Sequence, residues 1–225
     1  MSLQSDPFLQ RLNSPPARML LALLLFFTAG TVWAEEPPDA PDRRAALRSG
    51  DIETRRDSAA YLGRHGDVQS VPALLDALRD REPGVRNLAD NAIWSIWMRS
   101  GDAAIDEQMR SGAELLRMQR FDEALEIFAA VVKLRPDFAE GYNKRATALF
   151  YLGDYEHSLA DIAETLKRNA NHFGALSGAG LCWMALGDPG AALPYFQRAL
   201  ALNPNMTGVA ETIQELKRRT KGRTL

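Results

Sequence analysis

The feature that most constrains this chain is a 34-residue repeat that begins near residue 105. Small residues recur at fixed positions of the period, and large apolar residues recur at others. The aligned sets are Gly112, Ala146 and Gly180; Leu115, Leu149 and Trp183; Ala124, Ser158 and Ala192; Phe128, Ile162 and Phe196; and Pro136, Ala170 and Pro204. Two antiparallel helices can cross closely at small residues, while large side chains fill the space between neighbouring pairs. The period therefore predicts stacked helix pairs.

Turn signals occur in register with this period. Gly153-Asp154 and Gly187-Asp188 stand where the first helix of a pair ends and the second begins, because glycine suits a left-handed C-terminal residue and aspartate an N-cap. The first copy has Gln119-Arg120 there instead. Residues 207–220 predict a last helix whose polar outer face caps the stack.

With these features in place, the chain resembles the tetratricopeptide (TPR) repeat family. The resemblance rests on Gly141-x-x-Tyr-x-x-Arg-Ala146, Leu152-Gly-Asp-Tyr155 and Ala199-Leu-Ala-Leu-Asn-Pro204, and it covers three units over residues 105–206. It implies an all-α fold, a right-handed α-solenoid of antiparallel helix pairs. Residues 207–225 are then a capping helix and a basic tail.

A different repeat precedes the TPR units. Over residues 43–104 an offset of 31 aligns Arg55 with Arg86 and Leu62 with Ile93. Phrases such as Val71-Pro-Ala-Leu-Leu-Asp-Ala-Leu78 resemble HEAT-like repeats. Two such units are fewer than a free-standing array needs. We therefore expect this block to pack directly on the first TPR helix as one continuous solenoid, with Trp94 and Trp97 at the junction.

The N-terminal segment 1–34 has the pattern of a targeting sequence. Arg11 and Arg18 precede an uncharged run over residues 19–33, which ends in Val32-Trp33-Ala34. This order of basic, apolar and small residues predicts a signal peptide over 1–34, cleaved to give a periplasmic protein. An uncleaved inner-membrane anchor is the alternative. The Pro-rich acidic residues 35–42 predict an extended, disordered leader.

Composition and charge exclude several classes of function. The 225 residues carry 27 basic and 29 acidic side chains, a formal charge of −2, so a nucleic-acid partner is not expected. A single cysteine excludes disulfide frameworks and cysteine-based zinc sites. The basic run over residues 217–223 could touch anionic lipid or an acidic partner, but a solvated helix end that complements the helix dipole is the favoured interpretation.

The scarce reactive side chains do not converge in the sequence. His65, His157 and His172 lack a second ligand or base at helical spacing, and each is interpreted as a solvated surface residue. Cys182, in an apolar segment, is interpreted as a buried hydrophobe. The Gly178-Ala-Gly180 segment lies inside a helix and is not a phosphate loop. Asp154, Glu156 and Asp161 are interpreted as cap and solvent-face residues. No cofactor and no metal site are expected.

What the TPR resemblance implies is a concave surface lined by the first helix of each unit. The partner-binding residues expected there are Met109, Ala113, Leu116 and Arg117 from the first copy, Asn143, Thr147, Phe150 and Tyr151 from the second, and Ser177, Leu181 and Met184 from the third. Leu116, Phe150 and Leu181 could instead belong to the core. The charged clamp that chaperone-binding members use is missing, since Gly174 and Gly178 stand at two of its cationic positions, so binding of chaperone tails is not expected.

Taken together, the residues predict a non-enzymatic interaction protein of the bacterial cell envelope that binds a peptide or partner protein. The alternative is a membrane-tethered structural scaffold that uses residues 19–33 as an anchor. An enzyme built around His65 or Cys182 is a third hypothesis, with no constellation to support it.

Overall fold

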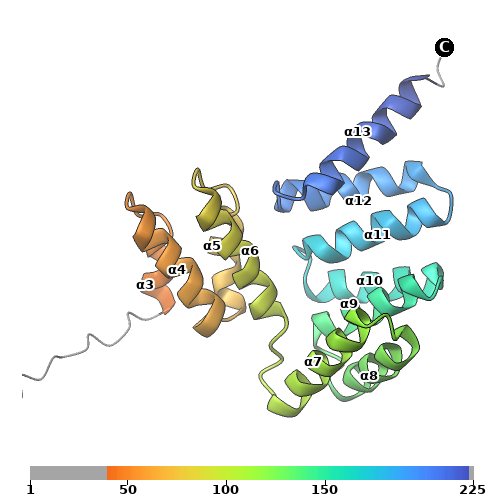
Figure 1. Ribbon diagram of the computed structural model, residues 1–225, viewed down its shortest axis with the longest axis horizontal. Helices are drawn as coiled ribbons and strands as arrows, with labels where there is room; N and C mark the ends of the chain where they lie inside the picture. Colours follow the sequence, from red (N-terminus) through yellow and green to blue (C-terminus); the bar gives the residue numbers. More distant parts are fainter. Residues whose placement is uncertain (1–39, 223–225) are drawn as a thin grey trace, which may run out of the picture. The chain divides into compact units, whose positions relative to one another are not determined.

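The computed structural model describes residues 40–222. The regular elements of the described residues are all helical (Figure 1). In chain order they are α3 (Ala40–Ala46), α4 (Ile52–His65), the 3₁₀ turn η1 (Val68–Ser70), α5 (Val71–Ala77), α6 (Pro83–Trp97), α7 (Ala103–Arg117), α8 (Phe121–Leu134), α9 (Ala139–Tyr151), α10 (Tyr155–Arg168), α11 (Phe173–Ala185), α12 (Pro189–Leu202) and α13 (Thr207–Gly222). The predicted all-α solenoid of helix pairs is confirmed.

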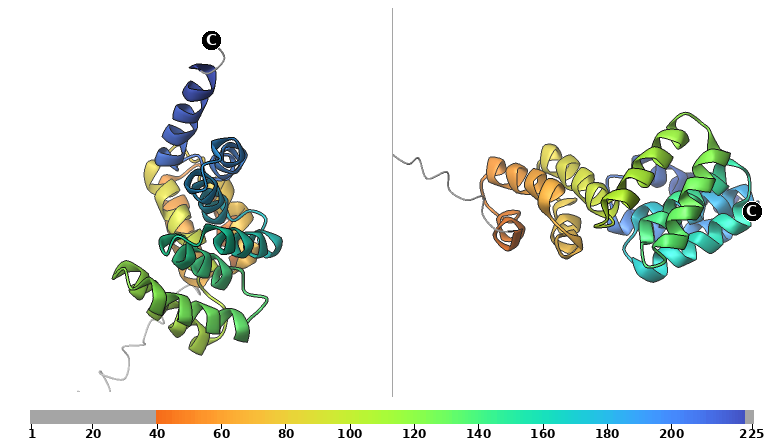
Figure 2. Two further views of the ribbon diagram at one scale, coloured as in Figure 1. Left: turned by 90° about the vertical axis from the view of Figure 1, so that its right-hand side faces the viewer. Right: turned by 90° about the horizontal axis from the view of Figure 1, so that it is seen from below.

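The three TPR units are the pairs α7–α8, α9–α10 and α11–α12, and consecutive pairs pack on each other through α8 with α9 and α10 with α11 (Figures 1 and 2). Their second helices begin at Phe121, Tyr155 and Pro189, which reproduces the period of the sequence. Helix α13 packs on α12 and continues the array, as a cap should.

Each pair closes on one small residue facing one large residue. A Cβ added to Gly112 would stand 2.6 Å from the Phe128 ring, and one added to Gly180 would stand 2.6 Å from the Phe196 ring. In the middle pair, Ala146 shares a core cluster with Ile162. The repeated small and large positions of the sequence are therefore matched in size within each pair: glycine faces phenylalanine in the first and third pairs, and alanine accompanies isoleucine in the second.

The predicted turns form, including the one without glycine. Gly153 and Gly187 have φ angles of +83° and +80°, and Asp154 and Asp188 cap the next helices by accepting from the backbone N–H groups of His157 and Ala191. In the first pair Gln119 adopts a φ of +60° instead. A left-handed glutamine costs more than a glycine, yet the turn keeps its geometry.

The block before the TPR units is also built from packed helices. Helices α4 and α6 pack together and begin at Ile52 and Pro83, in keeping with the offset in the sequence, and α5 packs on α6. Helix α3 begins at Ala40, so the leader predicted to be extended through Asp42 is helical over its last residues. An aspartate in the first turn and arginines in the last favour this short helix.

The predicted signal over 1–34 and the leader over 35–39 lie outside the described residues. Among the helices of the described region, none is both long and apolar enough to cross a membrane.

The junction between this block and the TPR units differs from the prediction. Trp94 and Trp97 do lie at it, but they pack against the start of the third unit's α11 rather than against α7: their ring centroids lie 5.5 and 5.0 Å from that of Phe173. The cause is a turn between α6 and α7, at which Gly101 has a φ of +81° and Asp106 accepts from the backbone and hydroxyl of Ser100 at 2.6 and 2.7 Å.

Hydrogen bonds extend this contact to the end of the third unit. Asn203 Nδ2 donates to Asp90 at 2.7 Å, Asn205 Nδ2 donates to the Leu78 carbonyl at 2.8 Å, and Arg79 donates to the Ala201 carbonyl. The block therefore contacts the turns between the repeats, and it does not continue the stack of helix pairs on the N-terminal side of α7.

Candidate functional site

Six of the predicted partner-binding residues line one groove of the TPR units. It has a volume of about 230 Å³, and its predicted members are Asn143, Thr147, Phe150, Tyr151, Ser177 and Leu181, joined by Ala146, Ser158, Ile162, Gly174, Gly178 and Met206. We call it the TPR groove. Helices α9 and α11, the first helices of the second and third units, supply most of it. The residues that the structure places in its lining are all uncharged.

Glycines and aromatic residues shape this groove. Gly178 presents no side chain and so leaves room between the helices, whereas the Trp94 ring fills the space beside Gly174. At the rim, Tyr151 stacks on Phe121 with centroids 4.7 Å apart, and Phe150 contacts Tyr151 edge-on. Tyr151 is 57% exposed and Leu181 is 45% exposed. Large apolar side chains at the mouth of an uncharged hollow are typical of a surface that binds another protein.

Five predicted residues lie elsewhere, and one of them, Ala113, is half-buried on α7. Met109 is fully buried in the core of the first pair, and Leu116 packs against the same cluster. Arg117 is exposed and pairs with Glu114 on its own helix. Met184 packs toward α13 and lines a separate hollow there. Among the described residues that line the groove none comes from the first copy, where Met109 belongs to the buried cluster that contains Phe128.

The asparagine of the TPR groove is engaged by hydrogen bonds within the protein. Asn143 is only 7% exposed, and its amide donates to both carboxylate oxygens of Glu140 at 3.2 Å. Thr147 donates its hydroxyl to the Asn143 carbonyl at 2.9 Å. The groove is therefore more apolar than its residue list suggests.

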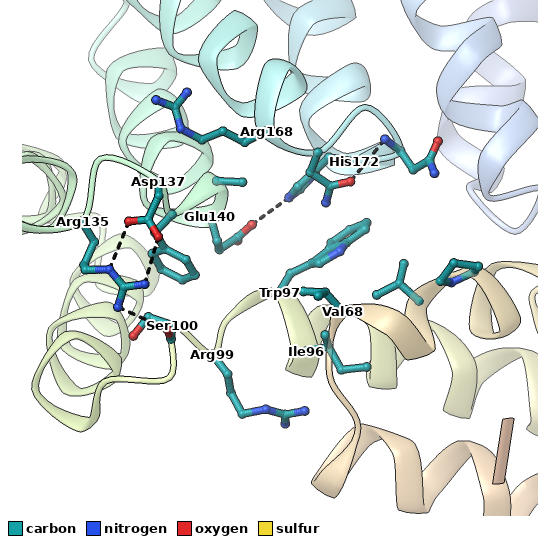
Figure 3. A pocket seen from close by; sticks show the side chains of 16 residues that line it. Val68, Ile96, Trp97, Arg99, Ser100, Arg135, Asp137, Glu140, Arg168 and His172 are labelled. Atoms are coloured by element: carbon teal, nitrogen blue, oxygen red, sulfur yellow. Dashed lines mark hydrogen bonds and ion pairs between the residues drawn. The ribbon is translucent and has the colours of Figure 1, made fainter. Parts of the chain in front are cut away.

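A second cavity, of about 420 Å³, lies between the end of α6, the start of α5 and the turns that open α9 and α11. Figure 3 shows Glu140 and His172 pointing toward one another on one side of it, with Trp97 beside them. His172 Nε2 lies 2.7 Å from the Glu140 carboxylate, and the His172 ring stacks on Trp97 with centroids 4.2 Å apart. Both polar side chains are at most 1% exposed.

The hydrogen bonds fix which ring nitrogen of His172 donates to Glu140. His172 Nδ1 accepts from the Ala175 backbone N–H at 3.0 Å, so the ring hydrogen stands on Nε2 and is donated to Glu140. Lys144 Nζ lies 3.3 Å from the same carboxylate. Burial raises the pKa of Glu140, but the bond from His172 and the charge of Lys144 outweigh burial and hold that pKa below its usual value.

The arginines around this cavity hold loops in place. Arg99 donates to the carbonyls of Gly63 and Gly66 at 2.7 and 2.6 Å, and Arg168 donates to the Pro136 carbonyl at 2.7 Å. Arg135 pairs with Asp137 at 3.1 Å, as Figure 3 also shows. Because these guanidinium groups already bind carbonyls and carboxylates of the chain, the cavity is a structural junction rather than an anion site.

The structure corrects two of the sequence interpretations, one at this junction and one within the second TPR unit. His172, predicted at the surface, is fully buried; the signal for its burial is the pair of tryptophans, which need a partner surface. Asp161, predicted on the solvent face, is 6% exposed and accepts two bonds from Arg145 at 2.7 and 2.6 Å. His65 and His157 are exposed as predicted.

The remaining reactive group is inert in its surroundings. Cys182 is buried, as predicted, and donates to the Ser158 hydroxyl at 3.3 Å. Burial raises the pKa of its thiol, which keeps it in the unreactive protonated form. Gly180 packs within α11 as predicted. Across residues 40–222, no three histidine, cysteine or acidic side chains gather as a metal site would require.

Comparison with known proteins identifies the repeats. Residues 110–156 and 143–207 match the tetratricopeptide repeat family. A TPR repeat-containing protein of Rhizobium etli is 31% identical over 144 residues, which cover 64% of this chain and 71% of that protein. The Hsp70-Hsp90 organizing protein of Triticum aestivum is 27% identical over 113 residues; these cover 50% of this chain and only 19% of that protein.

The fold agrees with this similarity. The first TPR domain of Spaghetti, solved with a bound HSP90 peptide, superposes with a TM-score of 0.50 at 20% identity, covering 52% of this chain and 93% of that domain. At this identity the likeness concerns the fold alone. The period, the matched helix pairs and the Rhizobium relative together show that this chain belongs to the tetratricopeptide repeat family.

Proposed function

We propose that this protein is a non-enzymatic adaptor that binds a segment of a partner protein in the TPR groove. The observation that carries the proposal is the groove itself: an uncharged hollow of about 230 Å³ between α9 and α11, with exposed Tyr151 and Leu181 at its mouth. Structures with the same repeats support it, since the Spaghetti TPR domain was solved with a peptide bound.

The lining indicates which kind of segment fits. The Spaghetti domain binds the acidic HSP90 peptide SRMEEVD. Among the described residues, those that line the TPR groove include no cation to receive such carboxylates. By the resemblance to the family, Gly174 and Gly178 stand at two positions where chaperone-binding members have cationic clamp residues. Burying an unpaired carboxylate in an apolar hollow is costly. We therefore propose a partner segment that is uncharged where it enters the groove and inserts an apolar side chain.

Placing a photo-crosslinking amino acid at Leu181, in the groove, tests this in the cell. The matched site is Gln197, which is exposed on α12, the second helix of the same unit. We expect one defined protein to crosslink from position 181 and not from 197, and we expect Gly178→Leu, which fills the groove, to remove it. Gly208→Leu is the control, because Gly208 faces open space. Equal products from both sites would reject the proposal.

The location in the cell envelope is a separate part of the proposal and rests on residues 1–34. Mass spectrometry of the protein purified from cells measures its first residue. A chain that starts at Glu35 in the periplasmic fraction supports an exported adaptor. A chain that retains residues 19–33 and sediments with membranes supports the alternative, a tethered scaffold, and a chain with the full N-terminus in the cytosol rejects both.

A further inference from the structure

A third hollow, of about 500 Å³, separates α6 from the turn between α12 and α13. Its lining includes Asn87, Asn91 and Trp94 on one wall, and Phe173, Asn205 and Met206 on the other. We call it the amide cleft. It lies beside the TPR groove, because Met206 lines both hollows and Gly174, in the groove, is in contact with the Trp94 ring.

The two asparagines of α6 set this cleft apart. Asn87 and Asn91 are exposed, and the hydrogen bonds found among the described residues do not involve their amides. Each amide carries a donor and an acceptor on one planar group, which matches the N–H and C=O of a peptide backbone. By contrast, Asn203 and Asn205 are engaged across the cleft, with Asp90 and with the Leu78 carbonyl.

The spacing of the Asn87 and Asn91 amides selects one backbone conformation. They lie one helical turn apart on the same face of α6, which corresponds to about 6 Å along the axis. In an extended chain, alternate residues direct their backbone groups to the same side and repeat every two residues, at about 7 Å. The two periods agree closely enough for both amides to bond residues i and i+2 of one extended segment. A helical ligand satisfies its own backbone groups and has none to offer at this spacing.

The far end of the cleft suits a side chain. Trp94 and Phe173 meet edge to face with centroids 5.5 Å apart, and Met206 adjoins them. The walls are held by the bonds of Asn203 and Asn205, so the cleft is preorganised rather than formed on binding. It offers backbone recognition along α6 and an apolar contact at the end nearest the TPR groove.

We propose that the amide cleft binds an extended peptide segment, with Asn87 and Asn91 bonding its backbone at alternate residues and Trp94 receiving an apolar side chain. This inference deepens the proposed function and rests on it, because the same partner segment would continue from the TPR groove onto α6. The 15 residues of α6 span about 22 Å, the length of about seven extended residues. The recognised chemistry is the backbone, so the cleft is tolerant of the partner's sequence there.

The test selects short random peptides, displayed on phage, against the full-length protein, and then titrates the selected synthetic peptides. The double variant Asn87→Ala with Asn91→Ala should weaken binding about tenfold or more, since each lost neutral hydrogen bond contributes modestly. Asn171→Ala, another exposed asparagine, is the matched control and should bind normally. The melting temperatures should be equal, because neither α6 amide supports the fold.

Methylating single backbone nitrogens of the peptide supplies a readout that a structural role would not move. We expect a loss of affinity at alternate positions in the natural protein, and no alternation in the double variant. Unchanged affinity in the double variant, with binding lost in Gly178→Leu, would overturn this inference and leave the proposed function standing. Peptides whose affinity neither variant lowers, or a selection that yields none, would reject both.

Discussion

The size matching between Gly180 and Phe196 allows a quantitative test of what holds a helix pair together. In Gly180→Ala the new Cβ would lie 2.6 Å from a ring that is 1% exposed, about 1 Å inside normal contact. Such overpacking costs about 1–3 kcal/mol, while alanine in a helix interior returns about 1 kcal/mol relative to glycine. The variant should therefore be destabilised by up to about 2 kcal/mol.

The matched change on the other side of the contact is Phe196→Ile, which leaves a gap beside Gly180 and should cost about 1–2 kcal/mol by itself. Together the two changes reproduce the alanine–isoleucine combination that the middle pair has at Ala146 and Ile162. We therefore expect the double variant to be more stable than the sum of the single effects by about 1 kcal/mol or more.

Urea denaturation followed by circular dichroism measures the four free energies of unfolding. Gly178→Ala is the control, because its Cβ would lie at an ordinary 3.4 Å from Ile162 and should stabilise the helix by about 0.5–1 kcal/mol. If the effects of Gly180→Ala and Phe196→Ile add to within about 0.5 kcal/mol, the two positions are not coupled and the size-matching argument is wrong.

Three further predictions concern the junction and the thiol. The pKa of Glu140 is lower in the folded protein than its ordinary value of 4.5, so the stability that Glu140 contributes is present above pH 4.5 and is lost as pH falls through the folded pKa. Glu140→Gln should therefore reduce the loss of folding stability at acid pH. A variant whose stability falls with pH as steeply as that of the natural protein would contradict this. Trp97→Ala should cost about 3 kcal/mol or more in urea denaturation, because a side chain packed on His172 and Phe173 is lost; a cost below about 1 kcal/mol would show that the junction contributes little. Cys182 should react with a thiol reagent only as fast as the protein unfolds, since it is fully buried; immediate labelling of folded protein would refute its placement.

The repeats are predictable from sequence because the period constrains many positions at once. The start of each second helix follows from the turns between the helices of a pair and from the repeated positions of small residues, and the structure places these helices as expected. The size matching of Gly112 with Phe128 is visible as two aligned columns, but the sequence does not state which column faces which. That information requires the crossing angle of the helices.

The candidate site is only partly predictable. Six of the seven predicted residues from the second and third copies line the TPR groove, because α9 and α11 have packed helices on each side, whereas Met184 packs toward α13. Met109 of the first unit is buried in the cluster that contains Phe128, and periodicity alone cannot distinguish a buried from an exposed residue on that face of the helix. The prediction for His172 is wrong for a related reason, since a residue at a repeat boundary is exposed in a simple stack and becomes buried only when another block packs on that boundary.

That packing makes the chain differ mechanically from an open row of repeats. In an open row of repeats each unit contacts only its neighbours, so the last unit can unfold separately and the row can bend along its length. Here Asp90 and Leu78 are tied to Asn203 and Asn205, partners separated by 113 and 127 positions. These bonds join the block before the TPR units to the end of the third unit. The connection raises the cooperativity of unfolding, slows folding through long-range contacts and keeps the width of the TPR groove fixed.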